Sequence, residues 1–317
     1  MYDGFLNIYK PAGVTSFDAV KMVLREILDG KKPEKKVKIG HAGTLDPLAE
    51  GVLVMALGRA SKLISRVQEQ KKTYIGTFRL GFSSPSEDVE TEMTPVPAGA
   101  PAPTLAQIEA VLPEFLGEIM QKPPIYSALK VNGRKAYDLA RKGKEVELKA
   151  RPIRIYELEV LKYEFPELTL KIVCGSGTYV RSLGRDLARR LGTEAVMSAL
   201  IRTAIGNFRA EDALEIRKRD DPRPLNRPHC TELIRPLFEA VPDLPRITYD
   251  LQDVRRLRTG IAVTHPAAEG MKPGDEAVVL NEAGDFLGIV RKTESGTLRS
   301  VLNFANETSD ANFPKEK

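Results

Sequence analysis

The residues best suited to chemistry lie in one glycine-rich segment, residues 40–51, which reads GHAGTLDPLAEG. It holds His41, one of three histidines in the chain, and it places Asp46 directly before Pro47. Glycine lets a backbone approach a ligand closely, and proline holds the preceding residue away from the helical conformation. We therefore expect Asp46 in a turn, with its carboxylate available to a substrate. An Asp-Pro turn without chemistry is the commoner role of this dipeptide taken alone.

Four further segments accompany it along the chain. They read KPAGVTS at residues 10–16, KTY at 72–74, QKPPIYSALK at 121–130 and GSGTYVRSL at 175–183. Together with residues 40–51, and in this order, they closely resemble the motifs of the bacterial tRNA pseudouridine-55 synthases, the TruB family. The resemblance extends along nearly the whole chain. Several matches in the order of the family are far more specific than any one of them.

The resemblance implies an isomerase that converts uridine 55 in the T-loop of tRNA to pseudouridine. That reaction breaks a C–N glycosidic bond, turns the base and rejoins it through carbon. Asp46 would be the catalytic carboxylate, as nucleophile or proton acceptor, a role familiar from other enzymes of glycosidic bonds. The sequence leaves open whether it attacks the sugar, attacks the base or removes a sugar proton. No metal, nucleotide or organic cofactor is implied.

The resemblance also assigns roles around Asp46. Arg181 would pair with the carboxylate and keep it ionised and aimed. Tyr74 would stack on the extruded base and complete the catalytic set. Tyr179 would line the same pocket, and Leu200 would wall it with apolar contact. The residue types alone also allow a surface arginine, a tyrosine in the core of a strand and an ordinary buried leucine.

RNA contacts are expected from three further residues. His41 would fill the space that the extruded uridine leaves, or serve as a hydrogen-bonded structural residue. Lys62 and Lys130 would contact phosphates, and a solvated surface position is equally open for each. The segment 83–87 departs from the family, which has threonines before an aspartate. Here it reads SSPSE, the acid is retained as Asp88, and RNA contacts of the family are not transferred to this loop.

Length and charge agree with a two-domain RNA-binding protein. The chain has 317 residues, a net charge of +5 and an isoelectric point near 9.0. Basic residues cluster within residues 31–38, 134–144 and 217–227. Such patches attract a phosphate backbone, although charge alone leaves solvated loops as an equal alternative. With tRNA, through its T-arm, as the expected partner, nothing in the sequence suggests more than a monomer.

Compartment and metal use follow from what the sequence lacks. It has no apolar stretch of the length that spans a bilayer and no signal-peptide pattern at its start, so we expect a cytoplasmic protein. Cys174 and Cys230 are its two cysteines. His229 beside Cys230 makes at most half of a zinc site, which needs about four ligands. We therefore expect no metal and no disulfide.

Hydrophobic periodicity and turn signals outline the elements that must position these residues. Thr15 or Ser16 can cap the first helix, and Thr104 with Gln107 resembles a capping box. The patterns predict helices at about residues 16–28, 105–115, 179–191 and 250–259, and strands at about 4–9, 73–82, 153–163, 167–174, 276–280, 286–291 and 297–303.

The fold class that the family implies is α/β, of the α+β kind, with a mixed, largely antiparallel sheet. The catalytic domain would span residues 1–240, with an RNA-clamping thumb at about 121–152. A small β-barrel-like domain of the PUA type would span 241–310 and help to grip tRNA. Residues 311–317 would be a frayed tail. We also expect the thumb to be mobile without RNA.

Parts of the sequence are compatible with two other functions. The triplet GSG at residues 175–177, between a strand and a helix, could begin a dinucleotide fingerprint of an NAD-linked oxidoreductase. Its sixth position is Val180, and a strand with an acidic end about 20 residues further on is missing. The second rival is a protein that binds or folds RNA without catalysis. The intact motif around Asp46 argues against loss of catalysis, and help with tRNA folding can coexist with it.

Overall fold

The computed structural model describes residues 2–29, 31, 37–97, 102–127, 130–131, 134–135, 148–216 and 228–305, with backbone alone for 130–131 and 134–135. Most of the expected thumb, the Lys130 side chain, most of the three basic runs and the tail at 311–317 lie outside these residues. The chain divides into two compact units. One is formed mainly by residues 6–234, and the other by residues 235 onward together with residues 3–5.

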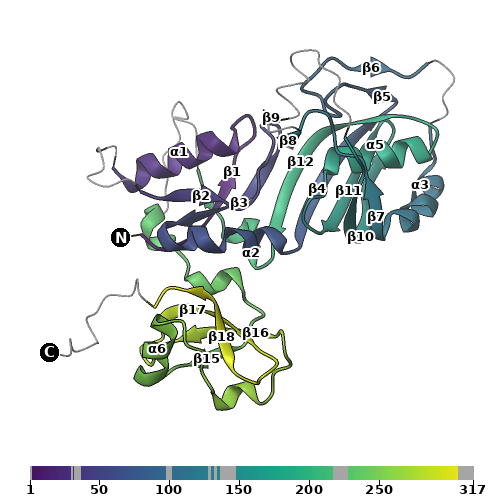
Figure 1. Ribbon diagram of the computed structural model, residues 1–317. Helices are drawn as coiled ribbons and strands as arrows, with labels where there is room; N and C mark the ends of the chain where they lie inside the picture. Colours follow the sequence, from purple (N-terminus) through teal and green to yellow (C-terminus); the bar gives the residue numbers. More distant parts are fainter. Residues whose placement is uncertain are drawn as a thin grey trace. The chain divides into compact units, whose positions relative to one another are not determined.

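The larger unit is built on a ten-stranded sheet (Figure 1). Neighbouring strands run in the order β14-β1-β3-β12-β4-β11-β10-β7, with β13 beside β12 and β2 beside β3. The run from β12 to β7 is antiparallel throughout, whereas β12 pairs with β3 and β1 with β14 in parallel. This confirms the predicted mixed, largely antiparallel sheet. The strands are β1 (Gly4–Lys10), β2 (Ile39–His41), β3 (Glu50–Leu57), β4 (Lys72–Leu80), β7 (Gly117–Gln121), β10 (Arg151–Glu164), β11 (Glu167–Cys174), β12 (Ala195–Ile205), β13 (Phe208–Arg209) and β14 (Leu214–Glu215).

One face of the central strands carries the main core. On β4 the buried residues alternate as the sequence predicts, and Tyr74, Phe78 and Leu80 share the buried face. Helix α5 (Val180–Arg190) packs on this face. Its Gly184 allows the close approach, because a Cβ there would lie 2.1 Å from the ring of Phe78. The start of α5 is thereby held directly over β4.

Strand β12 is a central strand that the sequence patterns did not predict. Its residues pair in parallel with β3 on one side and antiparallel with β4 on the other. Its register against β4 shifts between Met197 and Ala199 and again between Arg202 and Ala204. Each such irregularity adds a residue and interrupts strict alternation, so the period-2 signal is lost.

A second core lies under α1 (Ser16–Ile27). Thr15 is the N-cap, and its side chain accepts a hydrogen bond from the backbone N–H of Asp18. Ser16 Oγ lies 2.9 Å from the Leu45 nitrogen and 3.1 Å from its carbonyl oxygen, which ties the helix start to the segment that carries Asp46. The remaining elements of this unit are η1 (Gly58–Leu63), α2 (Ile64–Glu69), β5 (Phe82–Ser83), β6 (Thr94–Pro95), α3 (Leu105–Val111), η2 (Leu112–Phe115), β8 (Lys130–Val131), β9 (Arg134–Lys135), η3 (Ala210–Asp212) and η4 (Cys230–Leu233).

The predicted capping box is present at α3, where Thr104 and Gln107 bond reciprocally. The predicted helix over residues 105–115 is split, however, because Pro113 opens a 3-10 turn at its end. Proline removes an N–H that the α-helical pattern needs, so a tighter turn follows.

The C-terminal unit is a four-stranded mixed sheet in the order β15-β16-β17-β18. The strands β16 (Glu276–Leu280), β17 (Phe286–Lys292) and β18 (Leu298–Asn303) are antiparallel and confirm the predicted ones. β15 (Arg246–Thr248) adds in parallel, and α6 (Leu251–Arg258), η5 (Leu237–Ala240) and η6 (Pro266–Ala268) complete the unit. Its own apolar core includes Val254, Val279 and Leu287. No helix in the described ranges is long and apolar enough to cross a bilayer.

Candidate active site

Asp46 lies in the loop between β2 and β3. The two strands pair through His41 and Met55, and the chain then turns through Gly43, which adopts a positive φ of 106°. The loop rejoins the sheet at Gly51, with φ of 104°, where a Cβ would lie 2.2 Å from the carbonyl oxygen of Arg202. Only glycine allows that approach, which places the end of the Asp46 loop directly against β12.

Residues 10–16, the segment that begins with Lys10, hold the other side of the Asp46 loop. Lys10 is fully buried, and its Nζ donates to the carbonyl oxygens of Val14 at 2.6 Å and Pro11 at 3.0 Å. It also lies 3.5 Å from the carbonyl oxygen of Pro47, which accepts a 2.7 Å bond from the N–H of Gly13. Burial lowers the pKa of Lys10 to about 8. Residues 10–16 therefore serve here as a backbone clamp on the Asp46 turn.

Arg181 joins two carboxylates. Its Nε lies 3.0 Å from Oδ2 of Asp46, and its Nη1 lies 3.4 Å from Oδ2 of Asp88. The pairing of Arg181 with Asp46 expected from the sequence is thus present in the structure. The Arg181 and Asp88 side chains are 6% and 1% exposed, whereas that of Asp46 is 37% exposed. Of the three groups, Asp46 is the one that a substrate can reach.

The environment of Asp46 raises its pKa above the ordinary value of 3.8. Burial is the main cause, and the charge of Asp88 adds to it. The charges of Arg181 and Lys10 lower the pKa but are outweighed. The expected pairing with Arg181 is present, and the net rise in the pKa of Asp46 is a feature that the sequence did not predict. Desolvation disfavours the charged form of a carboxyl group. The degree of desolvation depends on tertiary packing, which the sequence does not show directly.

The two residues expected to line the pocket belong to the core cluster that reaches the Asp46 loop at Leu45. Tyr74 on β4 and Leu200 on β12 are 8% and 7% exposed and belong to the same core cluster as Leu45. The guanidinium carbon of Arg202 lies 6.0 Å from the centre of the Tyr74 ring. Burial raises the pKa of Tyr74, and the charges of Arg202 and Asp46 also act on it. Tyr74 is therefore a core tyrosine whose hydroxyl also lies within the electrostatic influence of Arg202 and Asp46.

Tyr179 is the N-cap residue of α5, two positions before Arg181. Its backbone is held by the buried side chain of Gln121, whose Oε1 accepts from the Tyr179 N–H at 2.9 Å. The Gln121 Nε2 donates to the Tyr179 carbonyl oxygen at 3.0 Å. The ring is half-buried, and burial raises the pKa of its hydroxyl. Gln121 is a positioning residue that sequence reasoning missed.

Two of the residues expected to contact RNA, His41 and Lys62, lie on separate elements. His41 is half-buried at the end of β2, and burial together with the charge of Arg202 lowers its pKa. Its Nδ1 has no hydrogen-bond partner among the residues that the structure describes. Lys62 lies exposed on η1, and the side chain of Lys130 is outside the described residues.

Arg202, a buried arginine that sequence reasoning missed, links the Asp46 loop to strands β3 and β12. Arg202 on β12 is 2% exposed and donates from Nε to the Val52 carbonyl oxygen at 2.8 Å. Its Nη2 donates to the Gly43 carbonyl oxygen at 3.1 Å. It thereby fixes the Asp46 loop to both β3 and β12. The available signal was an arginine inside the apolar run ALIRTAI.

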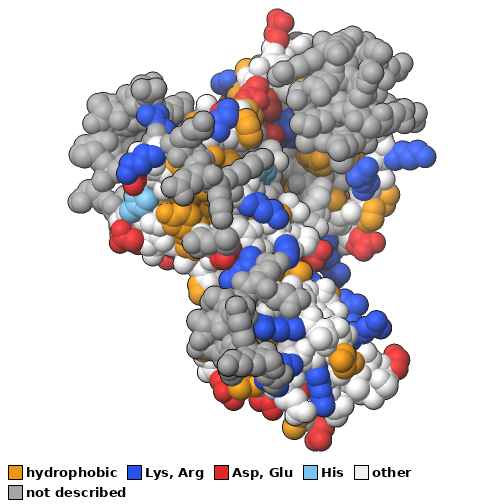
Figure 2. Space-filling model, turned by 60° about the vertical axis from the view of Figure 1, so that its left-hand side comes forward, with side chains coloured by type: hydrophobic (Ala, Val, Ile, Leu, Met, Phe, Trp, Pro, Cys, Tyr) orange, Lys and Arg blue, Asp and Glu red, His pale blue; other side chains and the backbone are white. Residues whose placement is uncertain are grey.

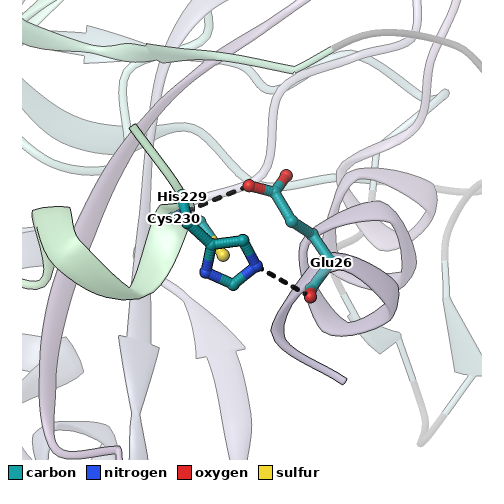
Figure 3. A group of neighbouring side chains, drawn as sticks. All are labelled: Glu26, His229 and Cys230. Carbon is teal, nitrogen blue, oxygen red and sulfur yellow. Dashed lines mark hydrogen bonds between the residues drawn. The ribbon is translucent and has the colours of Figure 1, made fainter. Parts of the chain in front are cut away.

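A separate cluster joins α1 to η4 (Figure 3). Among the described residues, Glu26, His229 and Cys230 bring ligand-type atoms within 4.8 Å of one another. Both ring nitrogens of His229 have hydrogen-bond partners, however: Nε2 lies 3.1 Å from the Glu26 carbonyl oxygen and Nδ1 lies 2.8 Å from Oγ1 of Thr231. The Cys230 N–H donates to the Glu26 carboxylate at 3.0 Å. These hydrogen bonds connect the C-terminal end of α1 to the start of η4.

Comparison with known proteins identifies the class of this site. Residues 30–180 match the family model described as TruB family pseudouridylate synthase, N-terminal domain. The tRNA pseudouridine synthase B of Dehalococcoides mccartyi (strain CBDB1) is 38% identical over 98% of this chain and 100% of its own. The protein of the same name from Rhodopirellula baltica is 39% identical over 86% of this chain and 79% of its own.

A solved structure has the same fold. A chain in the crystal structure of a Cbf5-Nop10-Gar1 complex matches with a TM-score of 0.65 and 26% identity, over 92% of this chain and 79% of that chain. The fold and these relatives define an isomerase of the pseudouridine synthase class. Within that class, the chain belongs to the TruB family.

Proposed function

We propose that this protein isomerises uridine 55 in the T-loop of tRNA to pseudouridine, with Asp46 as the catalytic carboxylate. The observation that carries the proposal is the asymmetry of the Asp46–Arg181–Asp88 group. Two of its members are buried and fixed, while the Asp46 side chain remains 37% exposed. A carboxylate that is both aimed by a buried arginine and open to a ligand is suited to covalent or proton-transfer chemistry at a glycosidic bond.

The surrounding residues support a flipped uridine as the substrate. Tyr74 and Leu200 contribute an aromatic ring and an apolar side chain to the core cluster that includes Leu45, the residue before Asp46, and Tyr179 lies at the start of α5. An extruded base is held by such stacking and apolar contacts, and a loop nucleotide is unstacked at a cost of only a few kcal/mol. His41 would then occupy the space left in the RNA.

The partner would be the T-arm of tRNA, bound by a monomer. Lysine and arginine side chains are spread over the described surface of both units on the face drawn in Figure 2. Binding through such side chains releases counterions and weakens as salt is added. Lys62 and Lys130 would contribute phosphate contacts, and the C-terminal unit, which we take to be of the PUA type, would add grip. The relatives are bacterial tRNA-modifying enzymes by name, which supports action in the cytoplasm.

The test uses an unmodified tRNA transcript, and pseudouridine is mapped by carbodiimide primer stops. We expect a stop at position 55 with the wild-type protein and none with Asp46→Asn. Asp243→Asn, which changes an exposed aspartate of the C-terminal unit, is the matched control and should behave as wild type. A transcript with cytidine at position 55 should give no stop. A stop elsewhere would refute the substrate assignment, and full activity of Asp46→Asn would refute the catalytic role.

A further inference from the structure

The first half of α5 carries two buried arginines one helical turn apart. Arg185, one turn after Arg181, is 8% exposed. Its Nη1 forms an ion pair with the carboxylate of Glu87, its Nε donates to Asp186 at 2.8 Å, and its Nη2 donates to the Lys122 carbonyl oxygen at 3.0 Å. Burial works against the charge of Arg185, but the carboxylates of Glu87 and Asp186 outweigh it and raise the pKa.

Glu87 is held from several sides. Its second carboxylate oxygen accepts a 2.6 Å hydrogen bond from Ser182 Oγ on α5. Its backbone adopts φ of 62°, a left-handed conformation that residues other than glycine rarely adopt, and its carbonyl oxygen accepts from the Met197 N–H at 3.0 Å. Such a conformation persists only where surrounding contacts impose it. The bonds from Arg185 and Ser182 to the side chain supply such contacts.

The residues on either side of Glu87 touch Arg181. The Ser86 carbonyl oxygen accepts from Arg181 Nη1 at 2.6 Å, and Asp88 forms the second carboxylate partner of the same guanidinium. Because Ser86, Glu87 and Asp88 are consecutive, any shift of Glu87 moves both acceptors. The same helix also holds the segment before residue 128, through the bond from Arg181 Nη2 to the Tyr126 carbonyl oxygen at 2.9 Å.

We propose that Glu87 and Arg185 form a second ion pair that positions Arg181, and through it the Asp46 carboxylate, for the reaction. They are positioning residues, since among the described residues neither side chain forms a hydrogen bond or an ion pair with Asp46. The proposal rests on the proposed function. It gives a role to residues 83–87, where the sequence departs from the threonine pattern of the family: a left-handed glutamate anchored on α5 holds this version of the loop.

The experiment compares two glutamate-to-glutamine variants whose arginine partners lie on the same helix, α5. Glu87→Gln removes the carboxylate partner of Arg185, and Glu114→Gln removes that of Arg190. The side chain of Glu87 is 13% exposed, whereas that of Glu114 is 46% exposed. Both substitutions keep the size of the side chain. Steady-state kinetics on tRNA transcripts would give kcat and KM separately. Amide hydrogen exchange of the free protein would report residues 84–89, where the Glu87 N–H donates to the Ser84 carbonyl oxygen and the Val89 N–H donates to that of Met197 on β12.

For Glu87→Gln we expect kcat to fall by about 10- to 100-fold with KM for tRNA nearly unchanged, because displacement of a catalytic group by less than about 1 Å has effects of this size. Exchange of residues 84–89 should accelerate. Glu114→Gln should change neither quantity. Arg185→Lys, which keeps the charge, should retain more of kcat than Arg185→Gln when both are compared at concentrations where circular dichroism shows each variant to be folded.

Two results would overturn the proposal. One is a folded Glu87→Gln protein with wild-type kcat, and the other is a change confined to KM. If the wild-type protein makes no pseudouridine at all, the proposed function fails, and the exchange measurement still decides the positioning claim. Equal protection of residues 84–89 in Glu87→Gln and Glu114→Gln would then reject it.

Discussion

The two ends of α5 carry the same chemical pairing in opposite surroundings. At the start of the helix, the side chains of Arg181 and Arg185 are 6% and 10% exposed and bind carboxylates of two distant loops, those of Asp46 and of Glu87 with Asp88. At its end, those of Arg189 and Arg190 are 57% and 59% exposed and pair with Glu194 and Glu114. The last two pairs have short distances, 2.9 Å and 2.6 Å, yet they lie in water.

Burial, rather than distance, therefore decides how much an ion pair contributes to stability and to the positioning of its side chains. An exposed pair is screened and contributes little to stability. A buried arginine whose carboxylate is removed leaves an uncompensated charge in a poor solvent. The pairs at the start of α5 can therefore hold a side chain in one position, whereas the exposed pairs at its end should do so only weakly.

The largest expected effect is on stability. Arg185→Ala removes one partner of a buried pair and leaves Glu87 without its counter-charge. We expect the free energy of unfolding of the larger unit to fall by about 3–5 kcal/mol. Urea unfolding, with Arg190→Ala as the matched control, measures it. Equal destabilisation by the two variants would break the contrast between the two ends.

The next effect is on activity. Arg181→Lys keeps the charge but loses the planar fork that reaches Asp46 and Asp88 together. We expect kcat to fall by about 10²-fold, the size typical for loss of a preorganised charge at a reacting group. Arg189→Lys, at the exposed end, should retain full activity. Single-turnover kinetics on a tRNA transcript would decide, and an unimpaired Arg181→Lys protein would show that geometry at this position is unimportant.

A smaller effect concerns pH. The pKa of Asp46 is raised, and the proposed reaction uses its ionised form, so kcat/KM should fall as pH decreases through a value above 3.8. The charge of Asp88 contributes to this rise, so Asp88→Asn should move the acid limb to lower pH. Rate profiles of the wild-type and variant proteins between pH 4 and 7 would show the shift. Movement in the opposite direction would mean that Asp88 acts mainly by orienting Arg181.

The smallest effect is expected at the exposed end. A double-mutant cycle of Glu114→Gln and Arg190→Gln should give a coupling energy within experimental error, and added salt should leave it there. The corresponding cycle of Glu87→Gln and Arg185→Gln should give a clear coupling. A strong coupling at the exposed pair would show that the end of α5 is more rigid than its exposure indicates.

Much of the fold was predictable because its signals are local. The cap at Thr15, the capping box at Thr104 and the alternation along β4 each report burial or bonding within one element. β12 escaped prediction because its bulges break the alternation and its place depends on β3 and β4. The same holds for Arg202, whose two carbonyl partners lie about 150 residues earlier in the chain.

The candidate site divides in the same way. The amino-acid sequence by itself determined which motifs are present, and hence the family and the pairing of Arg181 with Asp46. Tertiary structure alone decided that Arg185 is buried rather than a surface arginine, and that Glu87, 98 residues away, is its partner. It also decided that the pKa of Asp46 is raised. Desolvation and ion pairing depend on which distant segments meet, and a single sequence records only the local pattern of each segment.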